Sequence, residues 1–179
     1  MQLLKRTLDF SAALLGLIVL SPVVLLIGVI VRLTSSGPAI FRQTRIGLNE
    51  QPFICYKFRT MYAGTAQRAT HETSDTAITP AGKVLRRYKL DELPQLWNVL
   101  RGDMSLVGPR PCLPVQDELI SERRRRGVFS VRPGITGLAQ VEDIDMSEPE
   151  RLAERDADYI ATQSLTLDLT LIFKTIFRF

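Results

Sequence analysis

The feature that most constrains this chain is an uncharged apolar run near its N-terminus, FSAALLGLIVLSPVVLLIGVIV, which extends from Phe10 to Val31. A membrane helix needs about 20 predominantly apolar residues, so the run is long enough to enter a bilayer. It is longer than the apolar part of a cleavable signal peptide, and no clear small-x-small cleavage site follows it. The sequence therefore predicts a helix that anchors the chain in a membrane.

Ser21 and Pro22 interrupt this run near its middle. Proline has no amide hydrogen to donate to the carbonyl of Ile18, and its ring crowds the preceding turn, so we expect a kink there. The Ser21 hydroxyl can help to satisfy the freed backbone groups. Each half is then roughly 17 Å long, near half of a hydrocarbon core. The pattern fits a helix that enters one leaflet and leaves by the same face, and it equally fits a spanning helix with a tolerated proline.

The charged flanks of the run bear on how the helix sits in the membrane. Lys5 and Arg6 precede the run and Arg32 follows it, whereas a spanning helix usually carries its positive bias on one side only. Both flanks therefore carry the charge expected of cytoplasmic segments. A turn-forming Ser-Ser-Gly-Pro segment follows. We place the domain boundary there, with a membrane helix in residues 1–35 and a cytosolic, membrane-associated domain in residues 36–179.

The rest of the chain predicts a small α+β domain that is mainly helical. The segments AIFRQTRIG and PFICYKFRTM have the composition of two short strands, and a Gly-Leu-Asn turn between them predicts a β-hairpin. Helices are expected over residues 81–90 and over residues 113–126, where Gly127 ends the second one. A further helix is expected after Ser147, because Ser-Glu-Pro-Glu has the S-x-x-E form of a capping box.

Four further segments complete the prediction. Leu93, Leu96, Trp97 and Leu100 fit one face of a helix that follows the basic one. GDMSLVGPRPCLP is rich in Gly and Pro and predicts an ordered loop, and VRPGITGLAQV predicts another loop that leads into a short apolar strand. The period of the tail, SLTLDLTLIFKTIFRF, does not decide between strand and helix. As an amphipathic helix it would suit the membrane interface, and packing against the domain core is the alternative.

The inventory of metal-binding and nucleotide-binding residues excludes several classes of protein. Cys55 and Cys112 are the only cysteines and His71 is the only histidine, so neither a zinc centre nor a disulfide framework is predicted. The chain contains no G-x-x-x-x-G-K-[ST] loop and no G-x-G-x-x-G loop, which argues against a P-loop nucleotidase and a dinucleotide-binding fold. A reducing, cytosol-facing compartment is the simplest interpretation.

Two adjacent acids, Asp91 and Glu92, follow a basic cluster in RRYKLDELPQLWNVL. Pro94 suits the first turn of a helix, so the acids are expected at a helix N-terminus, where the dipole and free amides favour an ionised carboxylate. Such a carboxylate can act as a nucleophile or as a metal ligand, and an Asp–Glu pair suits Mg²⁺. Arg86, Arg87 and Lys89 precede the pair and can offset the charge of an anionic substrate. The alternative is an acidic pair on an ordinary protein surface.

Two other charged motifs are weaker candidates. Asp143 and Asp145 have the D-x-D form of many metal-dependent nucleotide-sugar glycosyltransferases, and a solvated turn is the alternative. The basic run 123–126 has the charge to hold nucleic acid or anionic lipid. The membrane segment in the same chain favours lipid headgroups, at about 1 kcal/mol per basic residue, so membrane phospholipids and no nucleic acid are the expected partners. The alternative is a solvated helix face.

Several segments resemble the bacterial sugar transferase family, the monotopic polyprenol-phosphate phosphoglycosyl transferases. They are KFRTM (57–61), LDELPQLWNVLRGDMSLVGPRP (90–111), RPGITGLAQV (132–141) and SLTLDLTLIFKTI in the tail. The resemblance extends over essentially the whole chain, including the apolar N-terminus with its Ser-Pro pair. It is closest to the small members that consist of little more than the catalytic unit.

The resemblance implies a reaction in which a phosphosugar passes from a UDP-sugar to polyprenol phosphate at the cytosolic face of the bacterial inner membrane, releasing UMP. Asp91 would be the nucleophile that carries a covalent phosphosugar, and Glu92 would help Asp91 to hold Mg²⁺. The helix would be re-entrant, kinked at Ser21 and Pro22. Family motifs also contain basic residues that would bind phosphate or substrate, with Arg86 and Arg132 the better matches and Lys57, Arg59 and Arg110 the weaker ones.

One departure from the family pattern leaves the substrate open. Many members continue the A-Q-V element with an Asn-Gly-Arg type of sequence, whereas residues 141–147 read VEDIDMS here, so neither the sugar nor the pathway can be transferred. Two alternatives to the transferase also stay open, together with the oligomeric state. One is a membrane-anchored scaffold that binds anionic lipid or nucleotide without catalysis, and the other is a D-x-D glycosyltransferase. The acid pair favours the transferase, because a pure binder of anions gains little from two carboxylates.

Overall fold

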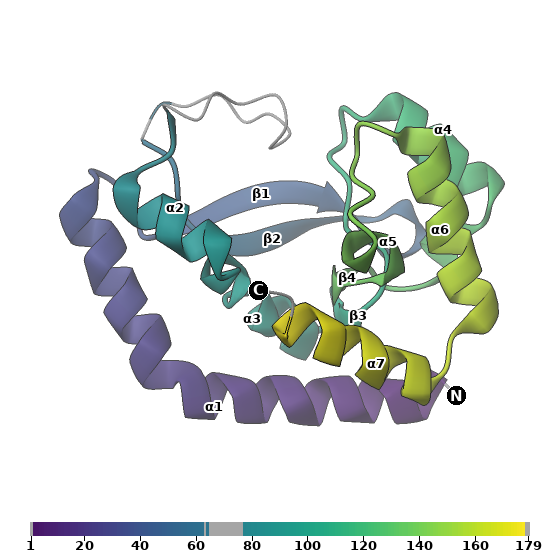
Figure 1. The fold of residues 1–179 in the computed structure, drawn as a ribbon, viewed down its shortest axis with the longest axis horizontal. Helices are drawn as coiled ribbons and strands as arrows, with labels where there is room; N and C mark the ends of the chain where they lie inside the picture. Colours follow the sequence, from purple (N-terminus) through teal and green to yellow (C-terminus); the bar gives the residue numbers. More distant parts are fainter. Residues whose placement is uncertain (1, 63, 65–76, 178–179) are drawn as a thin grey trace.

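The computed structural model of this chain describes residues 2–62, 64 and 77–177, so His71 lies outside the described residues. The domain is a mainly helical α+β structure with a long helix along one side, as predicted (Figure 1). Its helices and strands are α1 (Gln2–Thr34), β1 (Ile40–Ile46), β2 (Pro52–Phe58), α2 (Pro80–Arg87), α3 (Gln95–Arg101), β3 (Ser105–Val107), α4 (Asp117–Arg125), β4 (Gly134–Thr136), α5 (Leu138–Val141), α6 (Pro149–Thr162) and α7 (Leu165–Ile176). Short 3₁₀ turns include η1 (Leu48–Glu50), η4 (Leu90–Glu92) and η5 (Val128–Ser130).

The α1 helix contains the predicted apolar run and extends beyond it at both ends. Among the helices that the structure describes, it is the one that is long and apolar enough to cross a membrane. Pro22 lies inside the helix, and the Ser21 hydroxyl donates a hydrogen bond to the carbonyl of Ile18 at 2.8 Å. That carbonyl is the one which Pro22 leaves without an amide donor. Figure 1 shows α1 changing direction along its length. A re-entrant course through a bilayer stays a prediction.

One side of α1 is exposed and the other is fixed to the rest of the chain. Leu25 on the open side is 71% exposed, whereas Ala13 is fully buried in a cluster with residues of β2 and α3. The carboxylate of Asp9 accepts a hydrogen bond from the Ser105 hydroxyl at 2.7 Å and another from a β3 amide. Lys5 forms an ion pair of 2.5 Å with a carboxylate of α7. The first half of α1 is therefore held against both β3 and α7.

Two small sheets complete the framework. The predicted hairpin is confirmed, because β1 and β2 pair in antiparallel register with Ile40 opposite Phe58. The second sheet was not predicted: β3 and β4 pair in parallel, with Ser105 opposite Gly134, inside the two segments expected to be loops. A Cβ atom on Gly134 would lie 2.1 Å from the amide nitrogen of Gly108, so the backbones approach more closely than any other residue would allow. The helix α5, not the predicted apolar strand, follows β4.

The predicted capping box at Ser147 is wrong. The Asp145 carboxylate accepts hydrogen bonds from both the amide and the hydroxyl of Ser147, at 2.7 and 2.6 Å, and this local turn occupies the side chain. The α6 helix begins after it, at Pro149, a residue suited to a first turn. The α4 helix also begins later than predicted, and it ends just before Gly127, whose positive φ of 69° stops it as expected.

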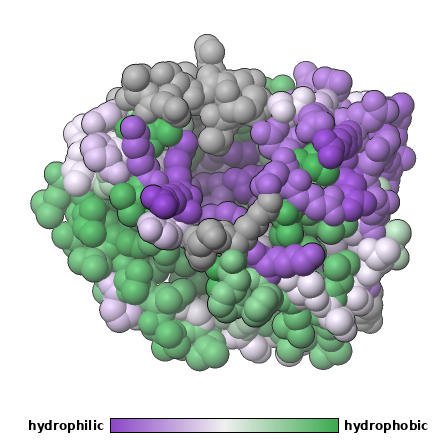
Figure 2. Space-filling view, in the orientation of Figure 1, coloured by the Kyte–Doolittle hydropathy of each residue, from purple (hydrophilic) through white to green (hydrophobic). Residues whose placement is uncertain are grey.

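The C-terminal tail forms the helix α7, one of the two structures that its sequence pattern allowed. The Ser164 hydroxyl accepts a hydrogen bond from the amide of Leu167 and caps α7. One face of α7 packs inward, whereas Leu169 and Phe173 are 67% and 61% exposed. Hydrophobic residues cover the side of the molecule where α1 and α7 run, and hydrophilic ones gather around α4 and α6 (Figure 2). Whether α7 lies in a membrane interface stays a prediction.

The α3 helix forms where predicted, but its buried face differs from the expected one. Leu96 and Leu100 pack against the cluster that contains Ala13 of α1. Trp97, which was assigned to the same face, is 52% exposed. The helix is only seven residues long, so its neighbours on one side, α1 and β2, decide which side chains are covered.

Candidate active site

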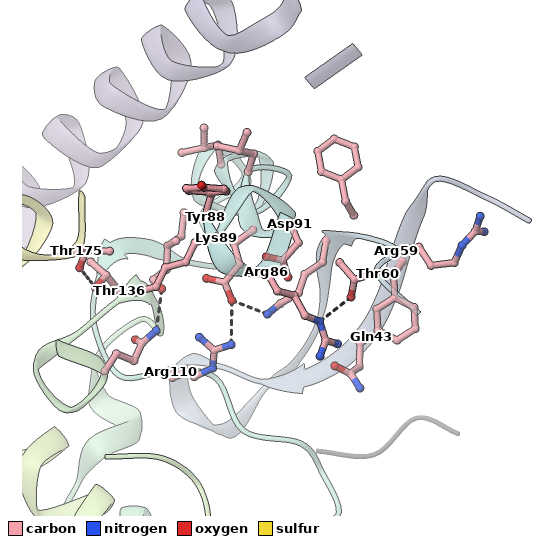
Figure 3. A pocket seen from close by; sticks show the side chains of 18 of the residues that line it. Gln43, Arg59, Thr60, Arg86, Tyr88, Lys89, Asp91, Arg110, Thr136 and Thr175 are labelled. Carbon is pink, nitrogen blue, oxygen red and sulfur yellow. Dashed lines mark hydrogen bonds and ion pairs between the residues drawn. The ribbon is translucent and has the colours of Figure 1, made fainter. Parts of the chain in front are cut away.

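A cavity of about 1070 Å³ lies at the junction of α1, β2, η4 and α7, and a hollow with hydrophilic walls is visible on the face shown in Figure 2. It brings together most of the site residues predicted from the sequence. Its lining includes the acids Asp91 and Glu92 and the predicted basic residues Lys57, Arg59, Arg86 and Arg110. Figure 3 shows Asp91 and Arg110 in the middle of this group, with Arg59 on one side and Thr136 and Thr175 on the other.

The two acids lie in η4, which follows α2 and leads into α3. Lys89 immediately before this turn has a left-handed backbone, with a φ of 54°, so the chain reverses sharply at that point. Pro94 stands at the N-cap of α3 instead of in its first turn. The sharp turn directs the short segment of Asp91 and Glu92 toward β2. The acids therefore lie in η4, just before the helix whose N-terminus was expected to carry them.

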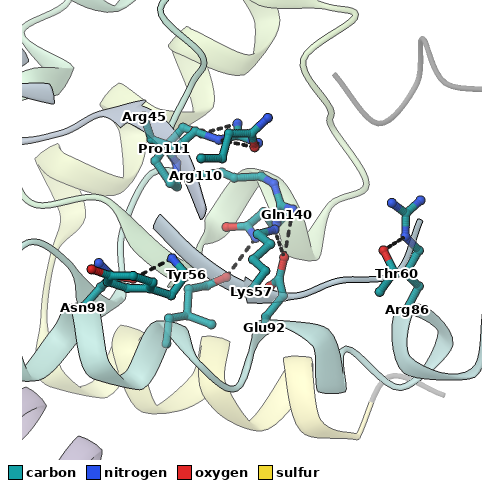
Figure 4. Close-up of polar contacts among 12 residues, drawn as sticks. Arg45, Tyr56, Lys57, Thr60, Arg86, Glu92, Asn98, Arg110, Pro111 and Gln140 are labelled. Carbon is teal, nitrogen blue, oxygen red and sulfur yellow. Dashed lines mark hydrogen bonds and ion pairs between the residues drawn. The ribbon is translucent and has the colours of Figure 1, made fainter. Parts of the chain in front are cut away.

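Glu92 is the centre of an ion-pair network that Figure 4 shows in close-up. Its Oε1 atom accepts a hydrogen bond from Lys57 Nζ at 2.7 Å and another from an Arg110 guanidinium nitrogen at 2.9 Å. Burial alone would raise the pKa of Glu92, but Arg110 and Lys57 outweigh it and hold that pKa well below its usual range. Glu92 therefore stays ionised at any physiological pH.

Asp91 has the opposite electrostatic environment. Burial raises the pKa of Asp91, and the negative charge of Glu92 raises it further, while Lys57, Arg86 and Arg110 act in the other direction. The adjacent acids thus have different environments: Glu92 forms ion pairs with Lys57 and Arg110, and Asp91 lines the cavity as a poorly solvated carboxylate. A carboxylate with a raised pKa in a cavity is a candidate functional group.

Basic side chains outnumber acids around the cavity. Among the described lining residues, the acids are Asp91 and Glu92, and the basic residues are Arg45, Lys57, Arg59, Arg86, Lys89 and Arg110. Arg86 is oriented by a hydrogen bond of 2.9 Å from its Nε to the Thr60 hydroxyl. Such a surplus of positive charge favours a ligand that carries phosphate groups.

Two of the predicted basic residues donate hydrogen bonds to backbone carbonyls. Arg59 donates hydrogen bonds to the carbonyls of Ser35, at 2.8 Å, and Pro38, and thereby fixes the linker after α1. Arg132 donates from Nε to the carbonyl of Gly102 at 2.8 Å, and it is not among the described residues that line the cavity. The phosphate-binding role of Arg132 stays a prediction based on resemblance, and its position in the structure adds no support.

The sequence did not reveal that Arg123 supports the site. Its side chain is 2% exposed and pairs with Asp156 of α6 at 2.6 Å. The same guanidinium donates to the carbonyl of Arg110 at 2.8 Å. A chain of contacts therefore runs from Asp156 through Arg123 and Arg110 to Glu92. In the sequence Arg123 is one of four consecutive arginines, and nothing distinguishes it from the others.

The D-x-D motif lies away from the cavity. Asp143 and Asp145 are both exposed, and neither is among the described residues that line the cavity. Asp143 has a left-handed backbone, with a φ of 58°, and Asp145 accepts the hydrogen bonds of Ser147. These are the features of a solvated turn, which was the alternative interpretation of the motif.

The acid pair can contribute only part of a Mg²⁺ site. Within the described residues there is no group of three or more His, Cys, Asp or Glu side chains that could hold a metal ion. Both ion pairs of Glu92 described above use its Oε1 atom. Magnesium is commonly held by one or two carboxylates together with substrate phosphates and water. Asp91 and Glu92 therefore fit Mg²⁺ when a phosphate ligand completes the coordination.

The chain is similar to enzymes that act on undecaprenyl phosphate. The family model described as "Bacterial sugar transferase" matches residues 1–179. A protein from Caulobacter vibrioides named UDP-glucose:undecaprenyl-phosphate glucose-1-phosphate transferase is 43% identical over 96% of this chain. One of the same name from Escherichia coli is 40% identical over 99% of it. A UDP-N-acetylgalactosamine-undecaprenyl-phosphate N-acetylgalactosaminephosphotransferase from Aeromonas hydrophila is 39% identical over 97% of it.

These relatives differ from the chain in length. The matched region is 68% of the Caulobacter protein, 43% of the Aeromonas protein and 40% of the Escherichia protein. The matched region includes α1, which is apolar and largely exposed. The names of the relatives specify a lipid phosphate as one reactant. Together with α1, these names indicate that the protein associates with a membrane.

Proposed function

This chain belongs to the bacterial sugar transferase family, and on that premise we propose that it transfers a phosphosugar from a UDP-sugar to a polyprenol phosphate, releasing UMP. The observation that carries the proposal is the position of Asp91. It is a partly buried carboxylate beside Glu92, at a cavity where basic side chains outnumber acids. A site built only to hold anions would gain nothing from a poorly solvated carboxylate at this point.

In the first step a carboxylate oxygen of Asp91 attacks the sugar-bearing β-phosphorus of the UDP-sugar. A new bond forms between this oxygen and phosphorus, and the bond from phosphorus to the bridging oxygen breaks. UMP leaves with that oxygen and with the electron pair of the broken bond. The product on the protein is an acyl phosphate that carries the sugar. Lys57, Arg86 and Arg110 stabilise the charge that spreads over the phosphoryl oxygens.

In the second step a phosphate oxygen of the polyprenol phosphate attacks the same phosphorus. The bond between Asp91 and phosphorus breaks, the carboxylate is regenerated, and a polyprenol diphosphate sugar forms. Both nucleophiles react as oxyanions, so neither step consumes a proton. Bound Mg²⁺, held by Asp91 and Glu92 with substrate phosphate, would supply Lewis-acid neutralisation of the phosphoryl charge.

The position of the cavity relative to the bilayer is part of the proposal. One reactant is water-soluble and the other is a lipid, so the reacting groups have to meet at the membrane surface. A re-entrant α1 that is kinked at Ser21 and Pro22 would place residues 36–179 on the cytosolic face, with the cavity at headgroup depth. Basic residues on both flanks of the apolar run support this topology.

The direct test is release of UMP from a panel of UDP-sugars in the presence of polyprenol phosphate and Mg²⁺. We expect at least one sugar to give UMP together with an equal amount of polyprenol diphosphate sugar. Rapid acid quenching and mass spectrometry of the digested protein should find the phosphosugar adduct on the peptide that contains Asp91. An adduct on another peptide would refute the assignment of the nucleophile, and no turnover with any UDP-sugar would refute the function.

Membrane topology has its own test. Cysteines introduced in place of Gln2 and Ser36 should be labelled from the same side of sealed vesicles by a membrane-impermeant reagent. The two native cysteines, Cys55 and Cys112, are buried and should give little background. Labelling of the two introduced cysteines from opposite sides would replace the re-entrant helix with a spanning one.

A further inference from the structure

The cavity that contains Asp91 has a second, apolar part. Beside the basic residues, its lining includes apolar side chains and one glycine. They come from α1, α3, β3, β4 and α7 and from the residues just before α3. We call this part the apolar arm; its residues are Gly16, Leu20, Leu93, Leu96, Leu106, Ile135, Ile172 and Ile176. No charged group belongs to this set. The cavity therefore has one end suited to phosphate and another suited to hydrocarbon.

Next to the arm, three polar groups bond to the protein itself: the hydroxyls of Thr136 and Thr175 and the amide nitrogen of Gln140. The hydroxyls of Thr136 and Thr175 lie 2.6 Å apart, and the Thr175 hydroxyl also donates to the carbonyl of Leu171 at 2.8 Å. Gln140 donates from Nε2 to the carbonyl of Ile135 at 3.0 Å. A sugar is bound through hydrogen bonds to its hydroxyl groups, whereas a hydrocarbon chain needs no such partner. These internal bonds thus favour a hydrocarbon in the arm over the sugar of the donor.

The arm is continuous with the apolar exterior. Ile176 lines the arm and is also 54% exposed, next to Phe173 and Phe177 on the same helix, which are 61% and 66% exposed. On α1, Leu20 lines the arm while its neighbour Val19 is 63% exposed. An apolar chain could therefore pass from the surface near α1 and α7 to the side of Asp91 without crossing a charged wall.

We propose that the apolar arm holds the phosphate-proximal isoprene units of the lipid acceptor. The inference rests on the proposed function, which supplies a polyprenol phosphate as acceptor, and it adds the place where the acceptor is bound. The acceptor's phosphate then lies at the basic end, beside Arg86 and Arg110, and its first isoprene units lie between α1 and α7. Because the cavity also has to hold the phosphosugar, the remainder of the chain stays outside it.

Gly16 offers a way to fill the arm without disturbing the donor end. A Cβ atom at Gly16 would lie 3.3 Å from the Cδ1 atom of Leu96, the end of a flexible side chain that also lines the arm. In Gly16→Leu the new side chain would project toward the arm, and replacing glycine within a helix favours its folding. Gly28 on the same helix is a matched control, since nothing lies within 4 Å of its Cβ position and it does not line the cavity.

We expect Gly16→Leu to raise the KM for a long-chain polyprenol phosphate at least tenfold and to leave the KM for the UDP-sugar within twofold of the wild-type value. A short-chain prenyl phosphate, which keeps the phosphate-proximal isoprene units, should show a similar rise in its KM. Gly28→Leu should change neither constant. An unchanged acceptor KM in Gly16→Leu, or an equal rise in both KM values, would overturn the assignment of the arm to the acceptor.

A second pair of variants tests the opening at α7. Ile176→Asn puts an amide where the arm reaches the surface, and Leu169→Asn makes the same change on an exposed residue of α7 that does not line the cavity. We expect Ile176→Asn alone to raise the acceptor KM at least fivefold. Equal effects of the two variants would point to membrane contact and overturn the arm. Failure of the wild-type protein to turn over any UDP-sugar would instead refute the proposed function.

Discussion

Two arginine-rich regions of this molecule look alike in composition and differ in what their charges do. In and around α4, the basic run 123–126 meets an acid at each position: Asp156 pairs with Arg123, Glu50 with Arg124, and Glu122 with the last two arginines. Around the cavity, six basic residues are collected from separate elements and share two acids. The densest basic segment in the sequence is thus neutralised, and the scattered residues leave a positive surplus.

The comparison teaches that charge left after pairing, and not charge density along the chain, marks a site for anions. The surface ion pairs of α4 stabilise the protein little individually, because solvent screens them, and their charges are largely cancelled. At the cavity, burial strengthens each interaction, and Glu92 gathers Lys57 and Arg110 around one carboxylate oxygen. The five predictions below test this difference, beginning with the largest expected effect.

The largest loss of activity is expected from a change at Asp91 in the cavity. Asp91→Asn should lower UMP release by about 10⁴-fold, because the amide oxygen is a far weaker nucleophile and cannot form the same acyl phosphate. Binding to vesicles should be unchanged, since α1 is intact. Asp143→Ala, in the exposed turn, serves as the control and should retain full activity. Normal turnover of Asp91→Asn with loss in Asp143→Ala would move the chemistry to the D-x-D motif.

Turnover of the UDP-sugar should depend on the positive charge of Arg110 at the cavity. Arg110→Met should lower kcat/KM for the UDP-sugar by about 100-fold, equivalent to about 2.7 kcal/mol, because Glu92 loses an ion-pair partner and the donor phosphate loses a cation. Lys83→Met, an exposed change on α2, is the control. Steady-state kinetics with varied UDP-sugar measures the effect. If Arg110→Met lowered only the thermal midpoint and left kcat/KM unchanged, Arg110 would be a structural residue.

The pH dependence of the rate should distinguish the effects of Asp91 and Glu92. Because burial and Glu92 raise the pKa of Asp91, its carboxylate becomes protonated at a higher pH than an ordinary aspartate, and the rate should fall as the pH drops through that raised pKa. Glu92→Gln removes the like charge, so the pKa of Asp91 should fall and the acid limb of the pH–rate profile should move to lower pH. Profiles of kcat/KM at saturating Mg²⁺ measure the shift. A limb that moved to higher pH would contradict this electrostatic coupling.

Within the basic run, Arg123 should differ from its neighbours. Arg123→Lys keeps the charge but loses the two-nitrogen contact with Asp156 and the bond to the Arg110 carbonyl, so the free energy of unfolding should fall by about 2 kcal/mol. Arg124→Lys, on the exposed side of α4, should leave stability nearly unchanged. Thermal unfolding in detergent compares the two. Equal losses would mean that the contacts from Asp156 through Arg123 to Glu92 add nothing to stability.

The smallest effect is expected for the exposed arginines of the run. The double variant Arg124→Gln, Arg125→Gln should keep both UMP release and binding to anionic vesicles within about twofold of the wild-type values, because these charges are already paired with acids. Flotation with vesicles of anionic phospholipid measures the binding. A large loss of flotation would restore the lipid-binding interpretation of the run and break the comparison between the two regions.

The sequence was sufficient where a pattern is local. The apolar run at residues 10–31, the hairpin and the basic helix α2 follow from composition and turn residues, and the Ser21–Pro22 pair predicted the hydrogen bond to the Ile18 carbonyl. The acid pair could also be found locally, because Asp91 and Glu92 are adjacent. Their opposite pKa shifts could not, since these depend on Lys57 and Arg110, which come from other elements.

The sequence was insufficient where the partner is remote or the element is short. The β3 and β4 strands have three residues each, too few to show a period, and they pair across an intervening helix. The side chain of Ser147 bonds to Asp145 instead of capping α6, a competition between two local bonds that the pattern alone does not decide. Arg123 was missed because Asp156, its partner, is 33 positions away.

The contacts of Lys5 with α7 and of Asp9 with β3 join the first half of α1 directly to the walls of the cavity. The helix and the cavity are consequently coupled mechanically. In the proposed topology, a bilayer that thins, thickens or curves around α1 would tilt both together and change the depth of Asp91 relative to the headgroups. Bilayer thickness would then control how easily the lipid reactant reaches Asp91.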